Sequence, residues 1–533
     1  MDSDRSLAGI SLDGPSEAQC LDGRSSPTLE QSSNRFSGNE ITTSRLDSLE
    51  SLIIMLGDAV IEEDDEYVSD YPLGLHKLLM PLILQRIIEP ISESKWTAMQ
   101  DYARAIEEIN ITNVRRHPTT VAETTYFRLA QLQGATPLFP RLDRLSILET
   151  PSTSQAISYS VLPMFLSPAF TSLSITGMGS SRRTSAVASF LGMLGPQSTL
   201  AHISLDYFSL SPAILKSIVG CGGLSRLAFT NVEGSIDQPS LHTLFSMPSL
   251  TNITFKTKKL EYLASEPVET LLPGSTQLSE LHLAGPFPLL SEWIKFFSGK
   301  CDLQGLEMEI IITTNDTTGK TANTGGKQYP SSADIAALIK EAVPAWQHSL
   351  LTFEMKLDRP LDDGLPPTFL DAFSGFAFLE KLTLMNTSLH NINLAVQRNV
   401  AHWPSLTYLH LPRSHSFCTV SMESLHCLAE NCPRLAFLRL LIQSPENDPF
   451  SDIASQGVHF PHVHLLSIGT FAAESDEPSV EQLCSIARNL LRVFPRLQTL
   501  ETNKSFSENR WRNIKVLIDL CRDAEKYSKA LSN

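Results

Sequence analysis

The chain has 533 residues, of which 42% are hydrophobic and 19% charged, and its formal net charge is −16. This acidic balance excludes a globally basic nucleic-acid-binding protein but leaves room for a local basic patch. No apolar run reaches the ~18 residues that a membrane-spanning helix needs, so no membrane partner is expected. Eight scattered cysteines, and an N-terminus without an apolar signal-peptide core, predict an intracellular protein of the cytoplasm or the nucleus.

Residues 1–45 are predicted to form a disordered tail. They are rich in serine and hold a single aromatic residue, Phe36, so they bury too little apolar surface to offset the entropy of ordering the chain. Ser26 is followed by a proline and is a candidate phosphorylation site. We favour a solvated tail without a regulatory role.

Residues 46–112 are predicted to form a helical module. Apolar residues recur at helical spacing from Leu46 to Leu56 and again from Trp96 to Ile106. The acidic run Glu62–Glu66 between them is expected to be a solvated loop, because clustered carboxylates repel one another and stay hydrated. The two apolar stripes are expected to pack into a core.

The segment 138–505 repeats one pattern, apolar–x–x–apolar–x–apolar, thirteen times, the last copy without its third apolar residue. One copy means little, since any apolar helix contains it, but thirteen at a mean spacing of about 30 residues indicate a repeat protein. Several copies follow a proline, which ends the preceding helix and favours an extended chain. The first apolar residues of the copies are Leu142, Phe170, Leu200, Leu224, Leu250, Leu278, Leu303, Leu350, Leu379, Leu406, Leu435, Val463 and Leu497.

Each copy is predicted to be a short strand followed by a helical return. The second and third apolar residues lie on one side of the strand, and no copy can bury that side alone, so the copies stack. The predicted fold is an α/β leucine-rich-repeat solenoid of about 13 degenerate repeats. The polar segment 315–332 is expected to be a surface loop, and the amphipathic segment 506–533 is expected to cap the stack, with a partner-binding helix as the alternative.

The motifs that would indicate catalysis or metal binding are incomplete. Residues 316–321, DTTGKT, end like a phosphate-binding loop, but position 314 is Thr where that loop has its first Gly. His459, His462 and His464 match no common zinc spacing and are expected to be loop histidines. Neither HExxH nor GxSxG occurs. We therefore expect no enzymatic activity, no metal and no cofactor.

The predicted solenoid instead presents the outward positions of its strands as a binding surface. These positions are small or polar in the early repeats, acidic in the middle, and aromatic or basic in the later repeats. Tyr and Arg are enriched in the residues that dominate protein–protein binding energy. The predicted protein-binding patch on the concave face, for which ordinary solvent surface is the alternative, consists of Lys381, Tyr408, His410, Phe437 and Arg439.

The segment CPRLAFLRL (432–440) resembles the cysteine-containing repeats of F-box leucine-rich-repeat proteins. The wider pattern resembles a family of fungal, basidiomycete-type F-box-like leucine-rich-repeat proteins, through KWTAMQDYARAI (95–106), LFPRLDRL (138–145) and FLSPAFTSLSI (165–175). The resemblance covers about residues 74–505. Members of this family use an F-box to bind the Skp adaptor of a cullin ubiquitin ligase, so the resemblance implies the same interaction here. No F-box is recognisable before residue 74, so no residue is carried over as an adaptor contact.

These observations predict a non-enzymatic protein-recognition subunit. The resemblance implies the substrate receptor of an SCF-type ubiquitin ligase, which would hold its target on the concave repeat face. The alternative is a leucine-rich-repeat binding scaffold with no link to ubiquitin, which the missing F-box favours. An enzyme is the third hypothesis, and no nucleophile–base pair in the sequence supports it.

Overall fold

The computed structural model describes residues 45–46, 49, 52–53, 55–56, 60–64, 83–87, 90–112, 119–121, 123–134, 136–148, 159–177, 181–196, 198–257, 259–263, 277–312, 330–361, 363–411, 419–442, 448, 450–470, 479–502 and 508–532. The predicted disordered tail, apart from Arg45, lies outside these residues, as does most of the predicted surface loop at 315–332.

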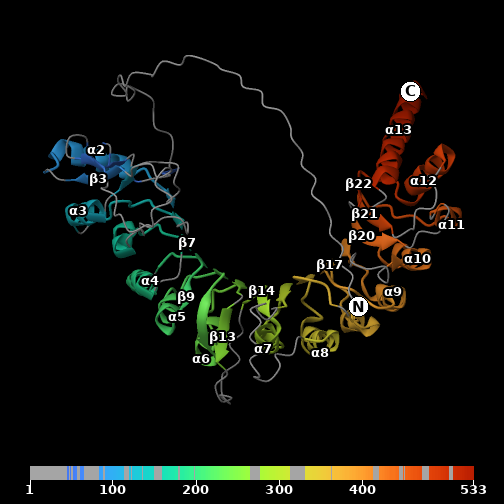
Figure 1. Ribbon diagram of the computed structural model, residues 1–533, viewed down its shortest axis with the longest axis horizontal. Helices are drawn as coiled ribbons and strands as arrows, with labels where there is room; N and C mark the ends of the chain where they lie inside the picture. Colours follow the sequence, from blue (N-terminus) through green and yellow to red (C-terminus); the bar gives the residue numbers. More distant parts are fainter. Residues whose placement is uncertain are drawn as a thin grey trace, which may run out of the picture. The chain divides into compact units, whose positions relative to one another are not determined.

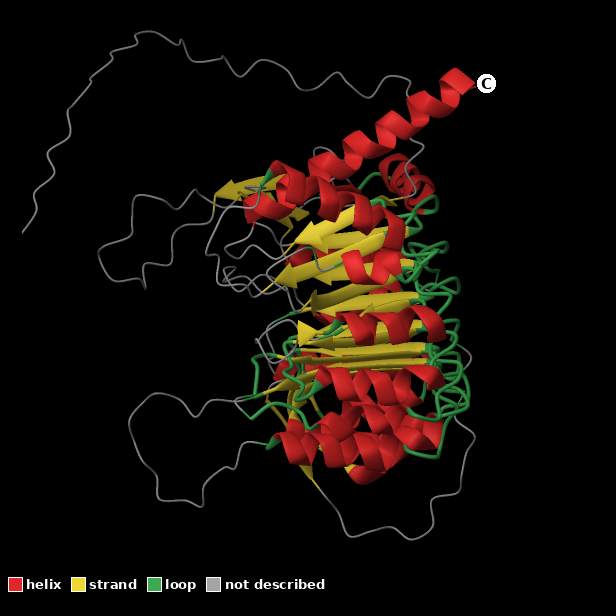
Figure 2. Ribbon diagram, turned by 90° about the vertical axis from the view of Figure 1, so that its right-hand side faces the viewer, coloured by secondary structure: helices red, strands yellow, loops and turns green. Residues whose placement is uncertain are grey.

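One long sheet runs through the described chain. It contains 16 strands, and every neighbouring pair is parallel. Figure 2 shows these strands as arrows stacked in one direction. Their order is β1 (Arg45–Leu46), β4 (Glu108–Thr112), β6 (Arg144–Leu148), β7 (Ser172–Thr176), β8 (His202–Asp206), β10 (Arg226–Thr230), β12 (Asn252–Lys256), β14 (Glu280–Pro286), β15 (Gly305–Ile311), β16 (Thr352–Leu357), β17 (Lys381–Met385), β18 (Tyr408–His410), β20 (Phe437–Ile442), β21 (Leu465–Thr470) and β22 (Thr499–Thr502), with β19 (Thr419–Val420) beside β20.

The register of this sheet follows the sequence repeat. The second apolar residue of each copy lies beside the same residue of the next, as in Leu382, Leu409 and Leu438. All thirteen predicted copies form strands, from β6 to β22, and these are neighbours in one continuous row. The prediction of an α/β leucine-rich-repeat solenoid is therefore confirmed.

The turns before the strands explain why proline recurs there. The N–H of Leu406 donates to the carbonyl oxygen of Trp403 at 3.1 Å, and the N–H of Leu435 donates to that of Cys432 at 3.1 Å. Each is a four-residue turn with Pro second, where its fixed φ suits the turn. The chain leaves this turn in the extended direction of the next strand.

Most segments between strands return as helices, and several of these begin at a serine cap. The side chains of Ser211, Ser331, Ser421 and Ser479 each accept a backbone N–H three residues further on. This hydrogen bond satisfies one of the free N–H groups of the first turn. In Figure 1 the helices lie along the outer side of the strands: α4 (Ser181–Leu194), α5 (Pro212–Val219), α6 (Gln238–Phe245), α7 (Phe287–Phe297), α8 (Ser332–Ala342), α9 (Ile392–Asn399), α10 (Met422–Asn431), α11 (Ser451–Ser455) and α12 (Val480–Val493). Four of the described returns contain a 3₁₀ helix: η2 (Tyr159–Phe165), η3 (Val343–Trp346), η4 (Pro367–Phe373) and η5 (Val400–His402).

The hydrophobic core lies between the sheet and these returns. The strand residues Leu382 and Leu384 are fully buried, and so are large side chains from the returns, such as Trp403. The indole Nε1 of Trp403 donates to the carbonyl oxygen of Phe373 at 3.0 Å. Each return thus contacts the preceding repeat as well as its own strand, so that neighbouring repeats share one core.

The predicted helical module at 46–112 differs from the structure. Its described long helix is α2 (Glu93–Ala103), whereas β1 and β4 extend the sheet and β2 (Val60–Asp64) pairs antiparallel with β3 (Ile83–Ile87). Because Glu62 to Asp64 lie in β2, the loop prediction for them was wrong. Ile106, Ile109 and Ile111 form a further copy of the repeat pattern, and assigning Ile106 to a helical stripe concealed it.

The segment predicted to cap the stack forms α13 (Glu508–Ser532), a helix of 25 residues. It lies against α12 and β22 and buries Trp511, Ile514 and Ile518. In Figures 1 and 2 its C-terminal part extends beyond the last strand. Among the described helices, none combines the length and the apolar composition that crossing a bilayer requires.

Candidate functional site

Two rows of side chains on the inner face of the sheet flank the second apolar position of each repeat. Residues on either side of the second apolar position leave the strand opposite the core, because side chains alternate along a strand. The parallel register aligns them across the sheet. The first row reads Arg144, Ser172, His202, Arg226, Asn252, Glu280, Gly305, Thr352, Lys381, Tyr408, Phe437, Leu465 and Thr499, and the second reads Ser146, Ser174, Ser204, Ala228, Thr254, His282, Glu307, Glu354, Thr383, His410, Arg439, Ser467 and Glu501.

Three of the five predicted binding residues are neighbours in the first row. The ammonium Nζ of Lys381 lies 5.1 Å from the centre of the Tyr408 ring. The rings of Tyr408 and Phe437 have centroids 5.4 Å apart, and Phe437 meets the His464 ring edge-on at 4.3 Å. These four side chains form a half-buried aromatic ladder across β17, β18, β20 and the turn before β21.

The basic residues of the patch are held by carboxylates. Arg439 forms an ion pair with Glu501, which lies two strands away on β22. Its guanidinium also donates a hydrogen bond to this carboxylate, and that hydrogen bond raises the pKa of Arg439 above its usual range. Lys381 forms an ion pair with Glu354 on β16. Glu501 was not predicted as a site residue, although it occupies the second-row position of the last repeat.

His410 is the predicted residue that the structure does not place on the accessible surface. The residue is only 8% exposed, and two other members of the second row, its neighbour Thr383 and Ser467 on the far side of Arg439, are also buried. Alternation along a strand gives the side of the sheet on which a residue lies, but neighbours decide whether it is covered. Ser467 lies on the strand between Arg439 and Glu501, which are joined across it.

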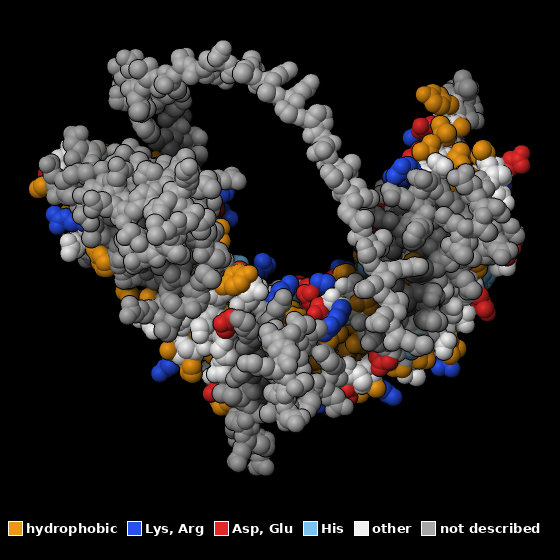
Figure 3. Space-filling view, in the orientation of Figure 1, with side chains coloured by type: hydrophobic (Ala, Val, Ile, Leu, Met, Phe, Trp, Pro, Cys, Tyr) orange, Lys and Arg blue, Asp and Glu red, His pale blue; other side chains and the backbone are white. Residues whose placement is uncertain are grey.

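The acidic positions predicted for the middle repeats form a network with basic side chains. Nδ1 of His282 donates to Glu307 at 2.7 Å, and Nζ of Lys256 lies 3.8 Å from the same carboxylate. The hydrogen bond raises the pKa of His282 and lowers that of Glu307. Figure 3 shows positive and negative side chains close together on the inner side of the stack, in the region of β14 to β17.

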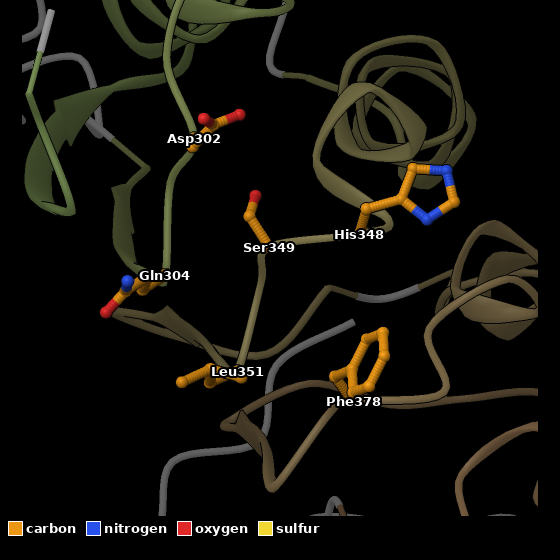
Figure 4. A pocket seen from close by; sticks show the side chains of 6 residues that line it. All are labelled: Asp302, Gln304, His348, Ser349, Leu351 and Phe378. Atoms are coloured by element: carbon orange, nitrogen blue, oxygen red, sulfur yellow. The ribbon is translucent and has the colours of Figure 1, made fainter.

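A shallow hollow of about 550 Å³ lies at the edge where the strands begin. Phe378, which is 55% exposed, lies on its rim. Figure 4 shows His348 and Asp302 on opposite sides of Ser349, so the titratable groups of the hollow do not face each other as an acid–base pair. The lining residues are Asp302, Gln304, His348, Ser349, Leu351 and Phe378.

The histidines considered for metal binding contact other groups, and the two buried cysteines have raised thiol pKa values. His464 packs against Phe437, and Nδ1 of His459 lies 3.1 Å from the carbonyl oxygen of Gly457. Burial raises the pKa of the Cys221 thiol to about 11 and that of Cys432 to about 12, so both stay protonated at neutral pH. Within the described ranges, no three His, Cys, Asp or Glu residues are grouped so that they could hold a metal ion. The DTTGKT segment lies outside these ranges.

The sequence matches no protein-family model and no curated protein. Among solved structures, it is similar to a leucine-rich-repeat protein of Leptospira interrogans. The two share 11% sequence identity, and the match covers 76% of this chain and 86% of that chain at a TM-score of 0.36. The fold assignment rests on this chain alone: its strands pair in one repeated register, which establishes that the described chain is an α/β leucine-rich-repeat solenoid.

Proposed function

We propose that this chain is a non-enzymatic protein-recognition subunit that binds a partner protein on its inner, concave face. The observation that carries the proposal is the aromatic ladder of Lys381, Tyr408, Phe437 and His464, with Arg439 beside it. Tyr and Arg are enriched in the few residues that dominate binding at protein interfaces. The half-buried rings offer apolar area at the surface of a sheet.

The surroundings of the ladder favour binding because they order it in advance. Ring contacts hold Tyr408 and Phe437, and carboxylates hold Lys381 and Arg439. Association costs about 0.5–1.5 kcal/mol for each flexible side chain that it immobilises. Side chains that are already held by neighbours lose less freedom, so more of the contact energy remains as affinity.

The finer proposal is that the bound protein is a substrate of an SCF-type ubiquitin ligase. Its support is the resemblance of residues 95–106, 138–145, 165–175 and 432–440 to F-box-like proteins. The Skp adaptor and the cullin are then proposed partners, and the protein acts inside the cell. The second candidate is a binding scaffold without a link to ubiquitin, favoured by the missing F-box motif.

The test compares partner capture by the full-length chain and two variants in native cells. Tyr408→Ala with Arg439→Ala removes the centre of the patch, whereas Phe378→Ala with Arg434→Ala removes the same two kinds of group, aromatic and arginine, from exposed turns. We expect the first variant to lose partners that the wild type and the control retain. Identical partner sets for all three proteins would contradict binding at this patch.

The same captures test the link to ubiquitin. Recovery of the Skp adaptor with the wild type and with both variants would support the ligase proposal, because adaptor docking is separate from the repeat face. If the adaptor is absent while other partners depend on Tyr408 and Arg439, the scaffold candidate holds.

A further inference from the structure

The inner face has a second distinctive region, at the opposite end from the aromatic ladder. On β6, β7, β8 and β10 the two rows contain arginine, histidine, serine and alanine but no carboxylate, and the carboxylate further along the same side of these strands, Asp206 on β8, accepts a hydrogen bond from Nδ2 of Asn231 at 2.9 Å. On the next four strands the same rows contain three glutamates. We call the first region the basic–hydroxyl face, and its residues are Arg144, Ser146, Ser172, Ser174, His202, Ser204, Arg226 and Ala228.

Arg226 is the cation of this face that has no counter-ion. Its side chain is exposed, and no carboxylate of the described residues forms an ion pair with it. Arg144, in contrast, forms an ion pair in which its Nη2 lies 2.6 Å from Oε2 of Glu108. His202 is adjacent to Arg226 in the register, and its pKa is lowered by burial and then by Arg226. His202 is therefore neutral at pH 7, and Arg226 supplies the positive charge.

Hydroxyl groups lie on the two strands that precede this cation in the sheet, β7 and β8. The Oγ of Ser172 lies 3.4 Å from Nδ1 of His202. Ser174 and Ser204 are partly exposed in the second row, and neither side-chain hydroxyl has a hydrogen-bond partner among the described residues. Their O–H groups can donate to an anion that pairs with Arg226, and such charge-assisted hydrogen bonds are about twice as strong as neutral ones.

The dimensions of the face fit a short extended peptide. Arg144 and Arg226 are separated by three strand spacings, or roughly 14 Å at about 4.8 Å each. An extended chain covers this distance in about four residues. The short side chains of Ser174, Ser204 and Ala228 would let such a chain approach the sheet closely.

We infer that the basic–hydroxyl face is a docking site for an acidic peptide segment of the partner protein. The inference rests on the proposed protein-recognition function and adds the chemistry of one part of the partner. The carboxylate or phosphate groups of that segment would pair with Arg226 and accept hydrogen bonds from the serine hydroxyls. The net charge of −16 repels an acidic peptide in general, so attraction would have to be local.

The test measures binding of a fluorescein-labelled probe, Gly-Ser-Glu-Glu-Gly-Glu-Glu-Ser-Gly, to the full-length protein by fluorescence polarisation. A probe with Gln in place of Glu removes the charge, and one with phosphoserine in place of two Glu residues distinguishes phosphate from carboxylate. Arg226→Ala removes the cation, Arg226→Lys keeps it, and Arg434→Ala is the control arginine, exposed in a turn of a later repeat.

We expect Arg226→Ala to weaken binding of the glutamate or the phosphoserine probe by about 5-fold or more, as loss of roughly 1 kcal/mol implies. Arg226→Lys and Arg434→Ala should stay within about 3-fold of wild type. Equal affinity for the Gln probe, or binding that Arg226→Ala leaves unchanged, would overturn the inference. If peptide binding does not depend on Arg226 but partner capture still depends on Tyr408 and Arg439, only this inference is wrong and the proposed function stands. If peptide binding is independent of Arg226 and partner capture is independent of Tyr408 and Arg439, the proposed function is contradicted as well.

Discussion

At the scale of single residues, the solenoid depends on side chains such as Leu409. This side chain is fully buried, and its residue lies in register between Leu382 and Leu438. Leu409→Ala should destabilise the protein by about 2–5 kcal/mol, because the transfer free energy is lost and a cavity remains. Hydrogen exchange should show the loss mainly in β17, β18 and β20, since each repeat contacts its neighbours.

Leu394 on α9 is the matched control, because it is 40% exposed. Leu394→Ala should change stability by no more than about 0.5 kcal/mol. Equal effects of the two substitutions, or a Leu409→Ala effect spread evenly over all strands, would contradict the stacking of neighbouring repeats.

The His282–Glu307 pair predicts a pH-dependent contribution to stability. The pKa of His282 is raised from 6.5, so its contribution is complete below pH 6.5 and is lost as pH rises through the raised value. The pKa of Glu307 is lowered from 4.5, so its contribution is complete above pH 4.5 and is lost at lower pH. Glu280 and Lys256 also face this pair. The pair should therefore stabilise the fold most between these two values.

Glu307→Gln should consequently lower the melting temperature more at pH 5.5 than at pH 8.5. The expected cost at pH 5.5 is up to about 1 kcal/mol, because both groups are partly exposed. Glu341→Gln, at an exposed position of α8, is the control and should show no such difference. A larger loss at pH 8.5 than at pH 5.5 would contradict the assignment.

The sequence allowed part of this residue-level arrangement to be predicted. Lys381, Tyr408 and Phe437 could be placed in one row, because alternation and the repeat fix both side and register. Glu501, the partner of Arg439, is 62 residues away along the chain. The two repeat intervals between their strands, from Leu435 to Val463 and from Val463 to Leu497, differ in length. The burial of His410 also depends on neighbours from other repeats, so a pattern within one repeat could not predict it.

At the scale of elements, strands were predictable where three independent signals coincide. The apolar triplet, the preceding proline turn and the helical return all occur around β18 and β20. At β4 the triplet Ile106, Ile109 and Ile111 follows directly on α2, and no proline marks its turn. Ile106 therefore fits a helical stripe equally well, so the sequence pattern alone does not identify this repeat.

The terminal helix α13 gives a prediction at this scale. Ile514 is fully buried, and α13 lies against α12 and β22. Ile514→Ala should cost about 2–4 kcal/mol, because solenoids need their last apolar face covered. Hydrogen exchange in β21 and β22 should accelerate.

Val516 on the same helix is 54% exposed and serves as the control. Val516→Ala should leave the exchange of β21 and β22 unchanged. If Ile514→Ala also left their exchange unchanged, α13 would not be a cap.

At the scale of the whole molecule, the side chains of the inner face change in character along one sheet. The basic–hydroxyl face occupies β6 to β10, a network of paired charges occupies β12 to β16, and the aromatic ladder begins at β17. Each zone is held on parallel strands in one register, so the spacing between zones is set by the number of repeats. A partner would be recognised by the order of these zones as well as by contacts within each.

Photo-crosslinking in native cells tests this account most directly. Phe437→p-benzoylphenylalanine places the reactive group on the inner face, and Leu394→p-benzoylphenylalanine places it on an outer helix. We predict that illumination joins a partner protein to the chain from position 437 and none from position 394. Crosslinks from position 394 with none from position 437 would contradict recognition by the inner face of the repeat sheet.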